Sequence, residues 1–242
     1  PTGSGKTTTL YSVLNHINSE GINIMTLEDP VEYPMALVRQ TSVAESAKLD
    51  FANGIRSMMR QDPDAILVGE IRDQDTAEMA FRAAMTGHQV YSTLHTNSAI
   101  GAVPRLLDIG ILPDIMAGNI IGVVAQRLIR KLCVHCKTPY QAESGELRLL
   151  GIAAEMPRPV IFRPCGCERC DFQGYRGRLA IMELLRVNGD MDELIARRAT
   201  AREMRKLARD MGFRALADDG LRRVLDGSTS IEELGRVVDL TD

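Results

Sequence analysis

The sequence predicts an α/β fold in which helices cover both faces of a parallel β-sheet. Up to about residue 130, short apolar runs alternate with segments of helical period, a glycine-rich loop precedes the first helix, and a cysteine-rich segment then interrupts the pattern. Strands that alternate with helices are typical of parallel βαβ units. We expect three parts: an α/β core over residues 1–130, a cysteine-rich insert over 131–178, and a strand with a small helical subdomain over 179–242.

The elements of the core are expected from apolar periodicity and from the residues that begin or end each segment. They are a helix from Lys6 that Gly21 ends, a strand over 22–27, a helix from Phe51 with Asp50 as N-cap, a strand over 65–68, a helix over 77–84 that Gly87 ends, a strand over 90–94, and a helix from Ile100.

The sequence gives weaker indications of secondary structure after residue 130. The insert has weak periodicity and several Gly and Pro residues, so we expect it to bury too little apolar surface to order itself. A strand over 179–187 follows, and then short amphipathic helices from Asp190 onward. Ser230 and Glu233 have the spacing of a capping box before the last apolar stripe.

The composition narrows the possible functions. Hydrophobic residues make up 45% of the 242 residues, and the formal net charge is −3. The negative balance disfavours a general nucleic-acid-binding surface. An aromatic content of 4% without Trp disfavours a stacking platform for single strands. No apolar run approaches the ~18 residues that a transmembrane helix requires.

The segment from Pro1 to Thr7 fits the phosphate-loop pattern G-x-x-x-x-G-K-[ST], except for its first Gly. Glycines let backbone N–H groups turn toward a phosphate, and the helix that follows directs its positive end at the anion. The lysine supplies charge to the β- and γ-phosphates, and the Thr7 hydroxyl is a ligand for Mg²⁺. The predicted nucleotide-binding residues are Gly3, Ser4, Gly5, Lys6, Thr7 and Thr8.

A phosphate loop normally follows a buried strand, which this sequence does not contain. We therefore expect the chain to be a piece of a longer protein.

Acidic clusters follow two predicted strands, where α/β folds place their ligand chemistry. Glu28 and Glu32 lie in the first cluster, over 27–32, and Glu70 lies in the second, over 66–73. His95 follows a third strand. Phosphoryl transfer needs carboxylates that hold Mg²⁺ and orient a water. Acidic residues at strand ends are also common in solvated loops, so the catalytic interpretation depends on both clusters following a phosphate loop.

Four boxes in this order resemble those of the bacterial secretion ATPases that power type II secretion and type IV pilus assembly. The boxes are the Walker A loop over 1–8, the Asp box over 26–33, the Walker B stretch over 61–73 and the His box over 86–97, and the match continues through Gln126-Arg127-Leu128 and Gly174-Tyr175-Arg176-Gly177-Arg178.

The resemblance implies a RecA-like P-loop NTPase core and ATP hydrolysis with Mg²⁺. We expect Glu28, Glu32 and Glu70 to share water positioning and metal electrostatics, with Glu70 as the general base, and His95 to sense the γ-phosphate. The resemblance also implies a homo-hexamer in the cytoplasm, attached to the inner membrane through the cytoplasmic domains of secretion or pilus platform proteins.

Five cysteines without a secretory signal indicate reduced thiols or a metal before disulfides. Cys133-x-x-Cys136 and Cys167-x-x-Cys170 fit a tetrahedral Zn²⁺ site, although their spacer exceeds the ~15–20 residues of ribbon motifs. Free thiols are the alternative, and Cys165 is an alternative ligand to Cys167. The resemblance supports a four-cysteine zinc knuckle and favours secretion or pilus extension over retraction.

The sequence therefore predicts an ATPase motor for pilus or pseudopilus assembly and does not separate type II secretion from pilus extension. Two rival functions stay open, an ATP-binding scaffold without turnover and a DNA-translocating motor of the same superfamily.

Overall fold

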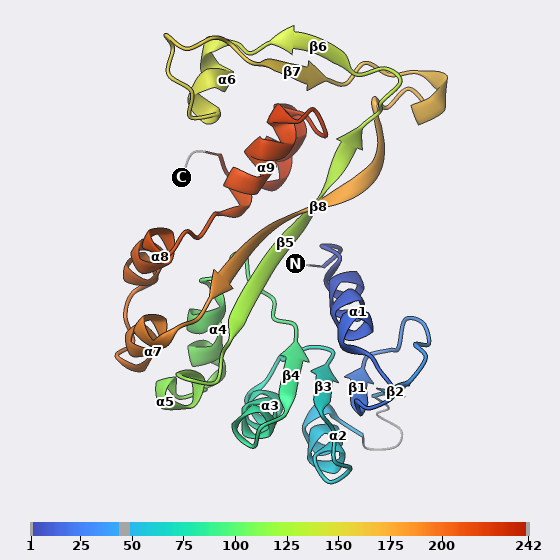
Figure 1. Ribbon diagram of the computed structural model, residues 1–242, viewed down its shortest axis with the longest axis vertical. Helices are drawn as coiled ribbons and strands as arrows, with labels where there is room; N and C mark the ends of the chain where they lie inside the picture. Colours follow the sequence, from blue (N-terminus) through green and yellow to red (C-terminus); the bar gives the residue numbers. More distant parts are fainter. Residues whose placement is uncertain (1, 44–48, 241–242) are drawn as a thin grey trace. The chain divides into compact units, whose positions relative to one another are not determined.

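The computed structural model describes residues 2–43 and 49–240 (Figure 1). The chain folds into two compact units. The first contains Lys6–Val123 and Leu185–Met211, and the second contains Gly3–Gly5, Val124–Leu184 and the chain from Gly212 onward. The boundaries at residues 130 and 178 rest on composition and remain predictions.

The first unit is built on a parallel sheet with the strand order β2-β1-β3-β4. Its strands are β1 (Ile24–Glu28), β2 (Val38–Ser42), β3 (Ala65–Val68) and β4 (Gln89–Ser92). The central strands β1 and β3 are buried at every residue, as a continuous apolar run in a covered parallel sheet should be. The predicted parallel α/β sheet is confirmed. The prediction missed β2, an edge strand with a polar, half-buried sequence.

Apart from the one-turn helix α5, the helices of this unit match the periodic segments of the sequence. They are α1 (Lys6–Ile17), α2 (Phe51–Met58), α3 (Gln74–Met85), α4 (Ala102–Ile109), α5 (Pro113–Met116), α7 (Gly189–Ala196) and α8 (Ala201–Asp210). Asp50 caps α2 as predicted, because its carboxylate accepts from the Asn53 backbone N–H at 2.7 Å. Helix α1 ends at Ile17, before Gly21.

Two helices pack on opposite faces of β1. Leu14 of α1 belongs to one buried cluster with Ile24 and Leu67. Gly54 of α2 faces Leu27, whose Cδ2 would lie 2.3 Å from a Cβ at that position. Because side chains alternate along a strand, Ile24 and Leu27 point to opposite faces. Glu28 is therefore on the face that α1 covers.

The second unit combines a two-stranded ribbon with the cysteine-rich insert and the last helices (Figure 1). Its elements are β5 (Gly122–Leu132) paired with β8 (Tyr175–Arg186), the antiparallel pair β6 (Thr138–Gln141) and β7 (Val160–Arg163), α6 (Ser144–Leu149), the 3₁₀ turn Glu168–Cys170, α9 (Leu216–Leu225) and α10 (Ile231–Val237). Strand β5 was missed by the sequence prediction, and β8 begins four residues before its predicted start at Leu179.

The expectation that the insert buries too little apolar surface is wrong. Leu147 of α6 and Ile161 of β7 are buried in one cluster with Ile181 of β8, Val224 of α9 and Leu234 of α10. The partners lie far away in sequence, so a periodicity search within the insert could not reveal this core.

The predicted capping box at α10 is half correct. Ser230 accepts from the Glu233 backbone N–H at 3.2 Å. The Glu233 carboxylate does not return to Ser230. It is fully buried and binds the guanidinium groups of Arg130 and Arg236, at 2.6 and 2.8 Å.

Candidate functional site

The glycine-rich loop has the backbone expected of a phosphate cradle. Gly3 and Gly5 have φ angles of 74° and 85°, in the left-handed region that favours glycine. Helix α1 begins at Lys6, directly after the loop. Thr7 and Thr8 lie in the first turn of this helix. The helix start and the loop glycines thus agree with the predicted nucleotide-binding residues, whose roles remain predictions.

Glu28 ends β1 and is surrounded by hydrogen-bond donors. Its carboxylate accepts from the Tyr11 hydroxyl, from the Thr26 hydroxyl at 2.6 Å and from the Gln40 amide at 3.3 Å. The side chain is only 4% exposed. Because three donors reach its two oxygens, Glu28 has little free acceptor capacity, which suits a structural acceptor better than a general base.

The Tyr11 hydroxyl organises this cluster from α1. It also accepts from the Glu32 backbone N–H and from the Gln40 amide, each at 3.3 Å. Burial and the hydrogen bond to Glu28 raise the pKa of Tyr11 to about 12, so the phenol remains a donor at neutral pH. Glu32 is exposed, and only its backbone N–H contributes to this cluster, through the hydrogen bond to Tyr11.

Glu70 and His95 follow neighbouring parallel strands, β3 and β4, and the structure brings them together. His95 Nε2 lies 3.2 Å from Glu70 Oε2. The other carboxylate oxygen of Glu70 pairs with Arg72, whose pKa rises because of that hydrogen bond. Glu70 is 13% exposed, whereas Arg72 and His95 are 65% and 47% exposed. Glu70 thus reaches solvent beside two exposed partners, unlike Glu28.

Four residues of these clusters were not predicted to take part, namely Tyr11, Thr26, Gln40 and Arg72. Tyr11 lies beside the apolar stripe of the first helix, a position typical of a core aromatic. Gln40 belongs to β2, which the prediction missed. Arg72 lies in the Walker B stretch, two residues after Glu70, so its position in the sequence could have indicated that it contacts Glu70.

Four cysteines form a second candidate site, in the second unit. The Sγ atoms of Cys133, Cys136, Cys167 and Cys170 all lie within 4.8 Å of one another. The Sγ separations are 3.9 Å for Cys133–Cys167 and 3.8 Å for both Cys136–Cys170 and Cys167–Cys170. Sulfurs at about 2.3 Å from a tetrahedral Zn²⁺ lie about 3.8 Å apart. The donor set therefore fits one tetrahedral ion.

Backbone amides surround these sulfurs as they would surround thiolates. The N–H groups of Gly166 and Gly174 donate to the Sγ atoms of Cys136 and Cys170, each at 3.3 Å. Cys165 is exposed and is not part of the cluster. The sulfur cluster therefore includes Cys167 and not Cys165.

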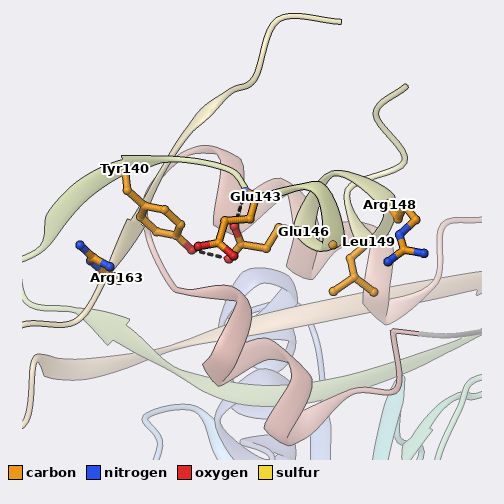
Figure 2. Close-up of a pocket in the computed structure, with 7 residues that line it drawn as sticks. Tyr140, Glu143, Glu146, Arg148, Leu149 and Arg163 are labelled. Atoms are coloured by element: carbon orange, nitrogen blue, oxygen red, sulfur yellow. Dashed lines mark hydrogen bonds between the residues drawn. The ribbon is translucent and has the colours of Figure 1, made fainter. Parts of the chain in front are cut away.

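A large open pocket lies in the insert and contains none of the predicted site residues. Its volume is about 660 Å³, and Tyr140, Glu143, Glu146, Arg148 and Arg163 contribute to its lining. Figure 2 shows the Glu146 carboxylate accepting from the Tyr140 hydroxyl and from the backbone N–H of Glu143. Two carboxylates and two guanidinium groups in the lining give this pocket no single charge preference.

Comparison with known proteins then identifies the family. The family model described as "Type II/IV secretion system protein" matches residues 1–236. The chain belongs to this family. Within the described part of this secretion-family chain, none of the helices has the length and hydrophobicity that a membrane crossing requires.

Named relatives fall into two groups. The chain is similar to "Type II secretion system protein E" of Pseudomonas aeruginosa, with 49% identity over 98% of this chain and 47% of the relative. It is also similar to "Type IV pilus assembly ATPase TfpB" of Acinetobacter baylyi, with 45% identity over 100% of this chain and 41% of the relative. The secretion-family chain thus spans about half the length of the curated relatives it matches.

A solved structure agrees with the family assignment. The pilus retraction motor PilT with bound ADP has a TM-score of 0.69 to this chain and 28% sequence identity, over 99% of this chain and 59% of PilT. The likeness covers both units of the secretion-family chain.

Proposed function

We propose that this chain is the motor part of an ATPase that powers pseudopilus assembly for type II protein secretion. The observation that carries the proposal is the Glu70–His95 pair at the ends of adjacent parallel strands, in a chain whose first helix begins with a phosphate loop. The 49% identity to a type II secretion protein E supports the secretion role. Type IV pilus extension is the second candidate, favoured by 45% identity to a pilus assembly ATPase.

ATP and Mg²⁺ would be held by residues at the start of α1. The N–H groups of the loop and the positive end of the helix would bind phosphate oxygens, with Lys6 as the neighbouring charge. Thr7 would offer its hydroxyl to Mg²⁺, which supplies charge neutralisation during phosphoryl transfer. In this proposal, these residues form the phosphate loop of a RecA-like P-loop core.

Glu70 would act as the general base, because its carboxylate is less enclosed than that of Glu28. Arg72 pairs with one of its oxygens, so this guanidinium would help to hold the carboxylate in place. His95 would sense the γ-phosphate from its place beside Glu70. Glu28 and Glu32 would contribute fixed negative charge and backbone order rather than proton transfer.

The assembly is also part of the proposal. A homo-hexamer would complete the nucleotide sites, and cytoplasmic domains of inner-membrane platform proteins would bind the ring and attach it to the membrane. No nucleic acid is expected as a partner, in line with the net charge of −3.

The four-cysteine cluster would hold one structural Zn²⁺. Its sulfur spacing and its N–H···S hydrogen bonds support this assignment. Four thiolates leave no open coordination position, so the ion would have no catalytic role.

The test is phosphate release by the full-length protein, with and without single-stranded or duplex DNA. Turnover without DNA and co-purification with a secretion platform protein would support the proposal. Nucleotide binding without any turnover would indicate a scaffold instead, and stimulation by DNA would indicate a DNA-translocating motor. Co-purification with a pilus platform protein would select the second candidate.

A further inference from the structure

The phosphate loop is held from behind by a residue of β5. Gln126 Nε2 donates to the backbone carbonyl of Ser4 at 2.6 Å, across 122 positions of sequence. Gln126 is 6% exposed and Ser4 is 4% exposed. The acceptor of this contact is the backbone carbonyl of Ser4. The Ser4 hydroxyl itself makes no hydrogen bond in the part of the chain that the structure describes.

Gly5 makes this approach possible. A Cβ at Gly5 would lie 2.9 Å from Gln126 Nε2 and 3.5 Å from Leu128 Cδ2. A side chain at position 5 would therefore require the Gln126 amide to shift, whereas Leu128 would be in ordinary contact with it. The φ of 85° at Gly5 by itself favours glycine.

The hydrogen bond fixes the direction of one peptide group. In a planar trans peptide, the C=O of one residue and the N–H of the next point in opposite directions. Gln126 holds the Ser4 carbonyl toward β5, so the Gly5 N–H points away from β5. Phosphate loops bind anions through such N–H groups, and their binding depends on how those groups are oriented before the ligand arrives.

We propose that Gln126 is a positioning residue of the phosphate loop, which orients the Gly5 N–H for a nucleotide phosphate. This inference rests on the proposed nucleotide site and adds a residue that lies outside the loop. Because Gln126 acts on a phosphate-binding N–H group, its loss should weaken the binding of nucleoside phosphates and leave the binding of the nucleoside unchanged.

The experiment measures binding to the full-length protein. Calorimetry gives the Kd for ADP, and competition with a fluorescent ADP analogue gives the inhibition constant of adenosine. Gln126→Ala removes the side chain, and Gln126→Glu keeps its shape but replaces the donor with a carboxylate. Gln141→Ala, in an exposed position of β6, is the matched control. We expect the Kd for ADP to rise roughly tenfold in both Gln126 variants, which corresponds to the loss of one buried hydrogen bond.

The inhibition constant of adenosine should stay within twofold of the wild-type value. If Gln126→Ala fails to fold, Gln126→Glu decides the result. Wild-type affinity for ADP in a folded Gln126→Glu protein would overturn the inference and leave the proposed function intact. Equal weakening of ADP and adenosine would also overturn it, since that pattern indicates a general disturbance of the site. A wild-type protein that does not bind ADP would overturn the proposed function together with this inference.

Discussion

His95 Nε2 lies 3.2 Å from Oε2 of Glu70, and Arg72 binds the other oxygen of the same carboxylate. The Glu70 carboxylate therefore has two partners, the Arg72 guanidinium and the His95 imidazole, and both are exposed. Glu28 differs from it, because three donors enclose its buried carboxylate. Under the proposed function, the Glu70 carboxylate is therefore the better candidate for a proton acceptor.

Replacing Glu70 by Gln should separate turnover from binding. The amide cannot accept a proton from water, so we expect hydrolysis by the full-length protein to fall about 10²–10⁴-fold with nucleotide affinity retained. Lys6→Ala should instead reduce affinity. Phosphate release and calorimetry measure the two effects, and Glu20→Gln, an exposed site, is the control. Wild-type turnover in Glu70→Gln would show that another group is the base.

Tyr11→Phe should destabilise the first unit. The change removes a donor from the buried carboxylate of Glu28, and a buried acceptor that loses its partner costs about 1–3 kcal/mol. Urea unfolding followed by circular dichroism gives the free energy of unfolding. Tyr91→Phe removes an exposed hydroxyl that binds Gln89 at 3.1 Å, and we expect it to change little. Equal stability of the two variants would contradict the role of Tyr11.

The cysteine cluster should contain about one zinc per chain when the protein is purified without chelator. Cys167→Ser should lose the metal and Cys165→Ser should retain it, because only Cys167 belongs to the cluster. Inductively coupled plasma mass spectrometry provides the measurement. The reverse pattern would transfer the ligand role to Cys165, and metal-free wild-type protein would end the zinc assignment.

The stability of the second unit should decrease in acid through Glu233. Burial opposes its charge, but hydrogen bonds from Arg236 and Arg130 prevail and lower its pKa to about 2. A glutamate in the unfolded chain has a pKa of about 4.3, so the stabilisation is complete above that value and disappears as the pH falls toward 2. The expected loss is about 3 kcal/mol below both pKa values, and about 2 kcal/mol of it falls between pH 7 and 3.

Urea unfolding at several pH values between 7 and 3 tests this expectation. Glu233→Gln should remove the part of the pH dependence that this residue causes. Glu232→Gln, at the neighbouring position, should retain it. An unchanged pH profile in Glu233→Gln would contradict the assignment.

Local signals in the sequence predicted the first unit well. Asp50 caps its helix because the capping pattern needs only neighbouring residues, and Ala65–Val68 is a strand because its apolar run is buried on both faces. Long-range contacts could not be predicted in this way. The bond from Gln126 to Ser4 and the one from Tyr11 to Glu28 join distant segments. Glu233 has capping-box spacing, but the fold brings Arg130 to it and changes its role.

The shared core of the insert has a consequence for the order in which the protein folds during synthesis. Leu147 and Ile161 leave the ribosome well before Val224 and Leu234, which complete their buried cluster. Domains form as the chain emerges from its N-terminal side, and apolar surface that waits for later partners is prone to aggregate. The insert must therefore remain incomplete, with its apolar side chains in contact with water or a chaperone, until α9 and α10 have been made.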